Sequence, residues 1–416
     1  MDINIPEPET KKIVIITTGG TIGQKKNNDG VKEPARGVIE HVTKVAIQSI
    51  GAETGLNLER QGISFEMRNL MLIDSGDTTP KTHLEIARAI FDASIEDGVM
   101  SVLVTTGTAK LNETINTMPL MVETRVPVIF VGSEKSHDEK STDAYRNMKK
   151  AIIASYELSN MGISGIYLSF NRRLIPATRV VEMDSSFYDI REFKGQIFGS
   201  FNKDILTLGE ERDLKIKETL RISCSTLYSA MAENVPLISI ISGVDKKSMS
   251  FILERAAEEF PALVLQTNHD MSAREDLHPT LERIAKKIPV FVTSFYPTFP
   301  YAEGIGSYQT SRKLYSMGIY PGTGQPFLDI AIARAAIGGS ENPREAFMDG
   351  VLRSHLENFH RNVIPIDLER RMGMEYIHAL TMARDMNERH GRVYSKLELL
   401  GTVRRETPVS RIKIHS

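Results

Sequence analysis

The 416-residue sequence has little of the cysteine, the charge imbalance and the long apolar runs that mark several classes of protein. Its single cysteine, Cys224, excludes an intrachain disulfide framework. No run of about 18 apolar residues occurs, and the polar first residues, MDINIPEPETKK, contain no apolar signal core. The 51 basic and 53 acidic residues nearly cancel, which argues against a general nucleic-acid binder. We therefore expect a cytoplasmic protein with neither a membrane nor a nucleic-acid partner.

The patterns of common metal and cofactor sites are also missing. The ten histidines form no HExxH pattern, and no paired cysteines or Walker loop occur. The stretch Gly304-Ile305-Gly306 lacks the third glycine and the strand-to-helix context of a dinucleotide site. Cys224 has no catalytic motif around it and is expected to be buried as a small apolar residue. The sequence predicts no metal and no cofactor.

The chain is long enough, at 416 residues, for two domains with a sizeable core, and its 41% hydrophobic and 25% charged residues are typical of a globular protein. Strand-like apolar runs alternate with helix-like segments, which predicts an α/β protein with parallel sheets and helices on both faces. The expected parts are a leader, an amino-terminal α/β domain, a linker, a smaller α/β domain and a helical extension, at residues 1–11, 12–208, 209–234, 235–341 and 342–416.

The hydrophobic pattern also predicts individual elements. Expected strands cover residues 13–17, 63–74, 99–105, 127–132, 165–170, 237–241, 262–266 and 289–294. Expected helices cover residues 38–50, 80–97, 110–123, 142–156, 248–259, 276–287, 307–317, 327–337, 343–359 and 368–390. Thr79 is the expected cap of the second helix, whose apolar face would comprise Leu84, Ala87, Phe91 and Ile95. Regular patterning weakens between residues 195 and 234, and residues 24–37 are expected to form a mobile polar loop with solvated charges.

The stretch KIVIITTGGTIGQ, residues 12–24, is the centre of this organisation. A buried parallel strand runs into Thr18-Gly19-Gly20-Thr21, and the two glycines allow the backbone to turn sharply beside a small ligand. Open α/β sheets bind ligands at the carboxyl ends of their strands. A threonine hydroxyl at this position can act as a nucleophile if a neighbouring group takes its proton.

Two further strand ends carry small polar residues. The strand 99–105 runs into Thr106-Gly107-Thr108, and the strand 63–74 ends in Asp74-Ser75-Gly76-Asp77 before a capped helix. Each alone is typical of an ordinary turn. Together with residues 18–21 they predict a pocket rich in hydroxyl groups.

These three motifs resemble those of the L-asparaginase family, which carries TGGTI near its amino terminus and HGTDT about ninety residues later. The resemblance covers residues 12–340 and implies a two-domain asparaginase fold. It implies that Thr18 is the nucleophile that attacks a side-chain carboxamide and that Thr108 belongs to its proton relay. Ser75 would hold the substrate carboxylate. The other substrate-binding positions implied are Gly20, Thr21, Asp74, Gly107 and Ala109. The family's sites are completed by a neighbouring subunit, so a homo-oligomer is also implied.

Two relay positions depart from the family pattern. The family has an aspartate directly after the second threonine, where this chain has Ala109, and a lysine where this chain has Glu182. One hypothesis is that the charges have exchanged sides, so that Lys110 and Glu182 form an ion pair near Thr108 and move its proton. The alternative is that Lys110 points to solvent and Glu182 pairs or caps elsewhere.

Two classes of function fit these residues. The first is an enzyme that uses Thr18 for amide or ester acyl transfer, by hydrolysis or by transfer to an amine, on an amino-acid-derived substrate other than free asparagine. The second is a binding or regulatory protein that keeps the fold without turnover. The intact Thr18, Ser75 and Thr108 favour the enzyme, whereas Ala109 and Glu182 favour the binding protein.

Overall fold

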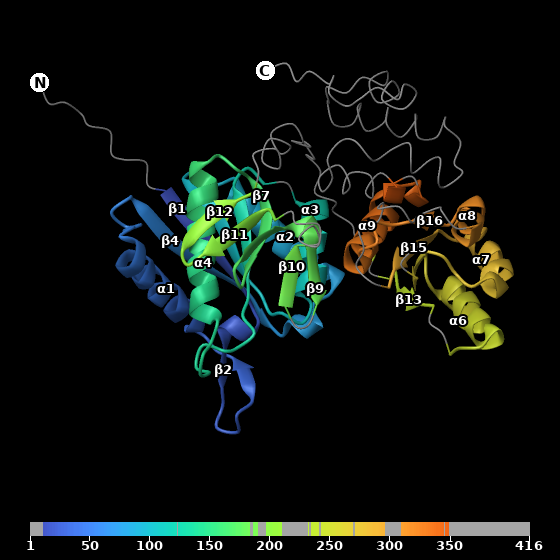
Figure 1. The fold of residues 1–416 in the computed structure, drawn as a ribbon, viewed down its shortest axis with the longest axis horizontal. Coiled ribbons are helices and arrows are strands. Elements are labelled where there is room, and N and C mark those ends of the chain that lie inside the picture. The colour runs from blue at the N-terminus through green and yellow to red at the C-terminus, as the bar shows by residue number, and fades with distance from the viewer. Residues whose placement is uncertain are drawn as a thin grey trace, which may run out of the picture. The chain divides into compact units, whose positions relative to one another are not determined.

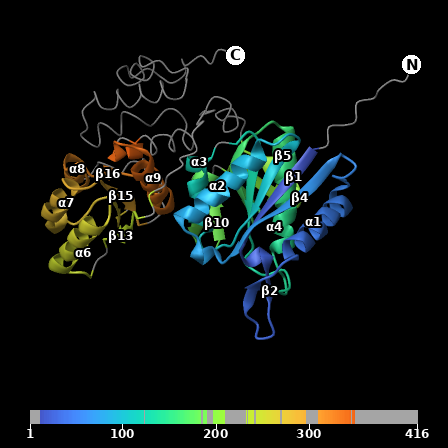
Figure 2. The same ribbon diagram turned by 180° about the vertical axis from the view of Figure 1, so that it is seen from behind.

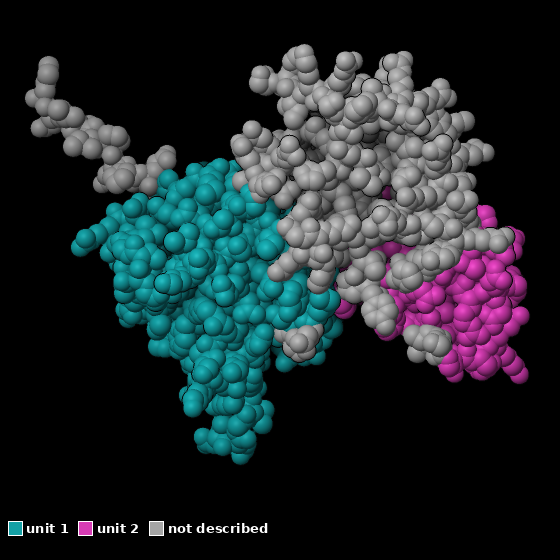
Figure 3. All heavy atoms as spheres, viewed as in Figure 1, with its two compact units in different colours: residues 1–219 teal, residues 220–416 magenta. Residues whose placement is uncertain are grey.

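The computed structural model describes residues 11–122, 124–183, 186–189, 197–209, 232, 234–240, 243–268, 271–295, 309–344 and 346–348. The chain divides into two compact units, residues 1–219 and 220–416 (Figure 3). Cys224, the stretch 304–306, nearly all of the expected linker and most of the expected helical extension lie outside the described residues.

The first unit is built around an eight-stranded sheet in the order β12-β11-β8-β7-β6-β5-β1-β4 (Figures 1 and 2). The strands of its parallel part are β1 (Lys11–Gly19), β4 (Ile63–Ile73), β5 (Val99–Thr105), β6 (Pro127–Val131) and β7 (Gly165–Phe170). These agree with the predicted strands to within two residues at each end. The middle strands β1, β5 and β6 are buried nearly throughout, as their continuous apolar runs predict.

The other end of this sheet is antiparallel, so the expected all-parallel sheet is wrong for the first unit. Its added strands are β8 (Arg173–Pro176), β11 (Gly199–Asn202) and β12 (Ile205–Leu208). Only Asn171 and Arg172 join β7 to β8, and a two-residue turn can reverse the chain but cannot cross over to a parallel neighbour. A separate antiparallel pair follows, formed by β9 (Val180–Met183) and β10 (Ser186–Asp189).

Helices cover both faces of the sheet, as predicted. Helices α1 (Val38–Thr54) and α4 (Ala144–Asn160) lie on one face, and α2 (Pro80–Ser94) and α3 (Leu111–Met121) lie on the other (Figures 1 and 2). Buried side chains of α1 and α4 form one hydrophobic core with those of the strands beneath them. The core therefore holds the sheet rigidly, and its strand ends can position polar groups.

Helix α2 begins as predicted but buries a different face. The Thr79 hydroxyl accepts a hydrogen bond from the backbone nitrogen of Thr82, which confirms the expected cap. The buried residues are His83, Ile86, Ala87, Ile90, Ala93 and Ser94, whereas Ile95 is 53% exposed. Of the expected face, Ala87 is buried as predicted, Leu84 and Phe91 are only half-buried, and Ile95 is exposed. Helix α2 is apolar on more than one side, and packing against β5 and α3 selects the side that is buried.

The segment expected as a polar loop contains a β-hairpin, formed by β2 (Gln24–Lys26) and β3 (Lys32–Pro34). The Glu139 carboxylate forms ion pairs with Lys26 at 3.0 Å and with Lys32 at 2.9 Å, so Lys26 is not merely solvated. The backbone nitrogen of Lys26 also donates to Asp138 at 2.9 Å. The loop that follows β6 therefore holds both strands of the hairpin.

The second unit contains a wholly parallel sheet in the order β13-β14-β15-β16, as predicted. Its strands are β13 (Leu237–Ser239), β14 (Leu263–Thr267), β15 (Val290–Ser294) and β16 (Tyr320–Pro321). Its helices are α6 (Lys246–Glu259), α7 (His278–Ala285), α8 (Gln309–Ser316) and α9 (Pro326–Gly339). No helix in the described part of the chain has both the length and the apolar character needed to cross a bilayer.

A buried carboxylate organises the turn between β16 and α9. Asp329 is fully buried and accepts hydrogen bonds from the Thr293 hydroxyl and from the backbone nitrogens of Thr323 and Gly324. A Cβ atom on Gly322 would lie 2.3 Å from the Asp329 carboxyl carbon. Burial, opposed by these hydrogen bonds, raises the pKa of Asp329 to about 6.

Candidate active site

The carboxyl ends of β1 and β5 meet through a direct backbone contact. Gly20 has φ 80°, and a Cβ atom there would lie 2.0 Å from the Gly107 nitrogen and 2.2 Å from its Cα atom. Gly19 has φ 100°, and its Cβ would lie 2.4 Å from the Ile73 carbonyl oxygen at the end of β4. Glycine is the residue that such close approaches and left-handed dihedrals require. The two glycines therefore bring the ends of three strands together.

The Thr18 side chain is buried between these strand ends. The residue is 3% exposed, and its hydroxyl donates to the Thr105 carbonyl oxygen at 2.8 Å. Within the described residues this is its one hydrogen bond, so no carboxylate, imidazole or amine takes the Thr18 proton in this arrangement. The hydroxyl is held in place, and the described residues place no base against it.

Ser75 lies against the loop that follows β5. A Cβ atom on Gly107 would lie 2.3 Å from the Ser75 Oγ atom, and that Oγ accepts a hydrogen bond from the Ala109 backbone nitrogen at 3.1 Å. Ser75 is buried, whereas Asp74 is exposed and its Oδ1 atom accepts from the Gly76 nitrogen at 2.8 Å. The structure thus brings Ser75, Gly107 and Ala109 into contact, while Asp74 serves as the cap of the turn.

The hypothesis of an ion pair between Lys110 and Glu182 is wrong for this structure. The Lys110 ammonium donates to the Thr78 carbonyl oxygen at 2.9 Å, and the described residues give it no ion pair with Glu182. The Thr78 hydroxyl in turn donates to the Ser75 carbonyl oxygen at 2.9 Å. Lys110 directly precedes helix α3, so its side chain lies beside the turn that holds Ser75 and its ammonium reaches the Thr78 carbonyl oxygen. The alternative of a solvent-directed Lys110 is also wrong.

Glu182 is a half-buried carboxyl group on strand β9. Burial raises its pKa above the usual value, and the described residues provide it with neither an ion pair nor a hydrogen bond. Thr108, also half-buried, likewise has no side-chain hydrogen bond within the described residues. A carboxyl group with a raised pKa and an unengaged hydroxyl are the kinds of group from which a proton relay is built.

Sequence reasoning did not find several groups that hold the site in shape. The Thr17 hydroxyl donates to the Asn69 Oδ1 atom of β4 at 2.8 Å. In the loop between β6 and α4, the Asp143 carboxylate accepts hydrogen bonds from the backbone nitrogens of Glu134 and Lys135, both at 3.0 Å. The Thr17–Asn69 contact joins positions 52 residues apart, so residue spacing carries no signal for it.

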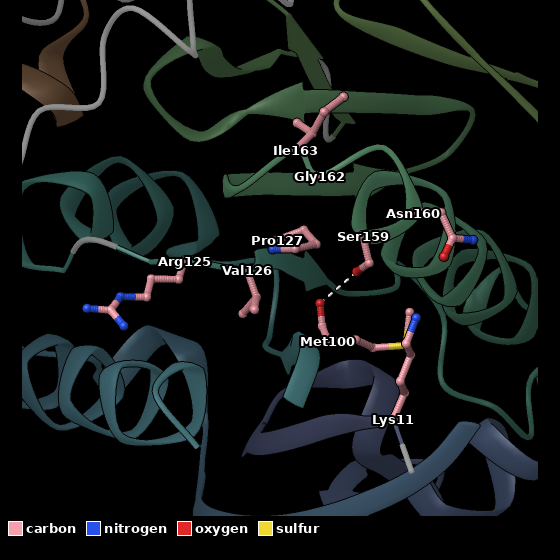
Figure 4. Close-up of a pocket in the computed structure, with 9 residues that line it drawn as sticks. All are labelled: Lys11, Met100, Arg125, Val126, Pro127, Ser159, Asn160, Gly162 and Ile163. Carbon is pink, nitrogen blue, oxygen red and sulfur yellow. Dashed lines mark hydrogen bonds between the residues drawn. The ribbon is translucent and has the colours of Figure 1, made fainter. Parts of the chain in front are cut away.

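The described part of the chain also contains an open depression at the opposite edge of the sheet (Figure 4). It is lined by Lys11, Met100, Arg125, Val126, Pro127, Ser159, Asn160, Gly162 and Ile163. Across it, the Ser159 hydroxyl donates to the Met100 carbonyl oxygen at 2.6 Å (Figure 4). It lies at the amino ends of β1, β5 and β6, whereas α/β sheets bind ligands at the carboxyl ends. The candidate site is therefore the Thr18 edge.

Metal binding has no support among the residues that the structure describes. None of their histidine, cysteine, aspartate and glutamate side chains gather in groups of three that could hold an ion. The groups that the structure brings together at this edge are instead hydroxyl groups, backbone amides and the Lys110 side chain.

Comparison with known proteins relates this geometry to a family. The family model described as "Asparaginase, N-terminal" matches residues 12–208. A glutamyl-tRNA(Gln) amidotransferase subunit of Methanococcus vannielii is 25% identical over 327 residues, which are 76% of this chain and 71% of that protein. An L-asparaginase of Thermococcus kodakarensis is 29% identical over 176 residues, 42% of this chain and 48% of that protein.

A solved structure confirms the predicted fold. The thermostable L-asparaginase from Thermococcus kodakarensis superposes with a TM-score of 0.66 and 21% identity, covering 81% of this chain and 96% of that chain. The matching segment contains the TGGTI motif at residues 18–22, whose two glycines make the close backbone contacts described above. The amino-terminal part of the chain, residues 12–208, thus matches the asparaginase family model, and the fold is that of an L-asparaginase.

Proposed function

We propose that the protein is an amidohydrolase or acyltransferase in which the Thr18 oxygen attacks the carbonyl carbon of an amide or ester. The observation that carries this proposal is the buried Thr18 hydroxyl, held at 2.8 Å from the Thr105 carbonyl oxygen beside the Gly20–Gly107 contact. Attack forms an acyl-threonine ester and expels an amine, ammonia or alcohol, which takes up the proton lost by Thr18. Water or an amine then cleaves the ester and restores the threonine.

We propose distinct roles for the neighbouring residues. Thr108 relays the Thr18 proton, and Glu182 is the candidate proton acceptor because its pKa is raised and its carboxyl group is unpaired within the described residues. Ser75 binds the substrate carboxylate. Lys110 is a positioning residue, since its hydrogen bond to Thr78 holds the turn that carries Ser75. The backbone of Gly20, Thr21, Gly107 and Ala109, together with the side chain of Asp74, completes the substrate pocket.

Free L-asparagine is not the substrate that these residues favour. Ala109 provides a methyl group where the resembled pattern has a carboxylate, so this position offers no charge to a substrate ammonium group. We expect little or no ammonia release from free L-asparagine or L-glutamine. A kcat/KM of about 10⁴ M⁻¹s⁻¹ or more on either amino acid would contradict this part of the proposal.

The direct test is a covalent one. Intact-mass spectrometry after incubation with activated amino-acid esters should detect one acyl adduct, and peptide mapping should locate it on Thr18. Thr18→Val should abolish the adduct. The matched control is Thr43→Val, because Thr43 is also buried but lies on helix α1, away from the strand ends that form the site. An adduct that persists in Thr18→Val would show that another residue is the nucleophile.

Restoring the resembled pattern tests the role of the two altered positions. The double variant Ala109→Asp with Glu182→Lys should gain turnover of free L-asparagine, while neither single change should suffice. If the double variant folds but gains no activity, the loss of these two charges is not what excludes asparagine. Its folding is checked by the far-ultraviolet circular dichroism spectrum.

A second candidate function is the supply of an amide to a transfer reaction within a larger enzyme. It is favoured by the similarity to a subunit of glutamyl-tRNA(Gln) amidotransferase, which extends over 76% of this chain. Under this function the chain acts with a partner protein, and release of the amide of glutamine should increase when glutamyl-tRNA and that partner are present. Unchanged release would exclude it.

A binding protein without turnover is the remaining alternative, and it predicts no adduct on Thr18 with any substrate. For either role we propose a cytoplasmic homo-oligomer, dimer or larger. Light scattering at micromolar concentration measures the assembly, and a monomer would contradict the proposed oligomer.

A further inference from the structure

A cluster of positive charges lies at a corner of the first unit away from Thr18. Its cations lie on helix α4 and the β7–β8 turn, at the far side of β6 from the site between β1 and β5, and its carboxylates lie at the end of helix α1 and in the β11–β12 turn. Its four cations are Arg146, Lys149, Lys150 and Arg172, and its two carboxylates are Glu53 and Asp204. Lys149 engages both carboxylates, at 2.8 and 3.0 Å. Two net positive charges therefore remain in the cluster.

Lys150 is the buried member of the cluster. The residue is 4% exposed, and its ammonium donates to the Asn171 carbonyl oxygen at 2.8 Å and lies 5.7 Å from the centre of the Phe201 ring. Within the described residues it forms no ion pair. An ammonium group has three N–H donors, and Asn171 accepts only one of them. A buried charge without a carboxylate partner is costly unless an anion accompanies it.

The two arginines add to this charge. Arg146 precedes Lys150 by four residues on α4, so both lie on the same face of the helix. Arg172 directly follows Asn171, whose carbonyl Lys150 contacts, and both arginines are exposed. Burial, then repulsion from Arg146 and Arg172, together lower the pKa of Lys150 to about 8, although Asp204 opposes the shift. The corner is thus short of negative charge.

We propose that this corner binds a phosphate group, with the guanidinium groups of Arg146 and Arg172 contacting its oxygens above the buried Lys150 charge. Arginine binds oxyanions of this shape with two parallel N–H donors, and two net positive charges match a phosphate dianion. The phosphate belongs to a small free ligand or to the end or backbone of an RNA, which present the same chemistry to the corner. The site is separate from the acyl-transfer pocket, so it would hold a second ligand or a remote part of the substrate.

Binding experiments distinguish the two sources. Inorganic phosphate is titrated by calorimetry, and a fluorescent mixed transfer RNA is titrated by anisotropy, both at low ionic strength. Arg146→Ala with Arg172→Ala should weaken binding by at least about tenfold. The matched control, Arg88→Ala, removes an exposed arginine of α2 and should leave affinity unchanged. Binding of phosphate alone indicates a small ligand, and binding of RNA that phosphate displaces indicates an RNA phosphate. Failure of both to bind, or equal binding by the double variant, would overturn the proposal.

A second measurement follows the unaltered protein and uses a variant only to assign the signal. The pKa of Lys150, followed by NMR of its labelled Cε atom, should rise from about 8 when phosphate is added, because a bound dianion stabilises the ammonium form. Lys150→Met serves to assign the resonance. A Lys150 pKa that phosphate leaves unchanged would mean that the anion binds elsewhere or not at all.

Discussion

Replacing Gly20 by alanine should separate the two strand ends that form the candidate site. The added Cβ would lie 2.0 Å from the Gly107 nitrogen, 2.2 Å from its Cα and 2.5 Å from the Thr106 carbonyl carbon. All three are backbone atoms, so no side chain can rotate to make room. Forced overpacking costs about 1–3 kcal/mol, and the positive φ of 80° adds about 1 kcal/mol for a residue with a Cβ. The expected loss of stability is therefore about 2–4 kcal/mol.

The matched control is Gly62→Ala. Gly62 also has a positive φ, 74°, but a Cβ there would have no atom within 4 Å. It should cost only the dihedral strain of about 1 kcal/mol. Urea unfolding followed by far-ultraviolet circular dichroism measures both variants, since the chain has no tryptophan to report by fluorescence. In thermal unfolding, Gly20→Ala should lower the midpoint by about 4–16 °C for a unit of this size.

The comparison of the two variants tests the steric argument. Equal destabilisation by Gly20→Ala and Gly62→Ala would refute it, because only the backbone contact distinguishes the positions. A folded Gly20→Ala protein should also lose acylation of Thr18, since the Thr18 hydroxyl is held against the Thr105 carbonyl by the same approach of β1 to β5.

Three further predictions concern charged groups. The pKa of Asp329, about 6, lies above its ordinary 3.8, so the contribution of this group to the stability of the second unit should be greatest below about pH 4 and fall by up to about 3 kcal/mol as the pH rises through 6; Asp329→Asn should remove this contribution to the pH dependence in unfolding experiments. The pKa of Glu139 is lowered first by Lys32, then by the Ser136 backbone and Lys26, so its contacts should weaken as the pH falls below its ordinary 4.5. Glu139→Gln should accordingly hasten proteolysis of the β2–β3 hairpin, whereas the exposed Glu134→Gln should not. Arg179 and Asp189 form a buried ion pair, so Arg179→Met should destabilise the first unit by about 3–5 kcal/mol in urea unfolding, because it removes the cation that pairs with a buried carboxylate; a loss below about 1 kcal/mol would contradict this.

The amino-acid sequence by itself determined the parts of this protein that depend on local pattern. The apolar runs of β1, β5 and β7 and the Thr79-Pro80 helix start are properties of short segments, so periodicity and capping predicted them. The same holds for the TGGT turn, where adjacent glycines signalled a close backbone approach before any neighbour was known. The family resemblance also depended on the order of this turn and the two later strand ends along the chain.

Tertiary structure alone decided the features that depend on which surfaces meet. Strands β8, β11 and β12 have only four residues each, too few to show a clear period, and their pairing gives them their place in the sheet. The buried face of α2 was selected by its neighbours. Lys110 has donors for several acceptors, and its sequence position could not show whether Glu182, solvent or the Thr78 carbonyl would be within reach. Long flexible side chains take the partner that packing provides, so spacing along the chain does not predict their contacts.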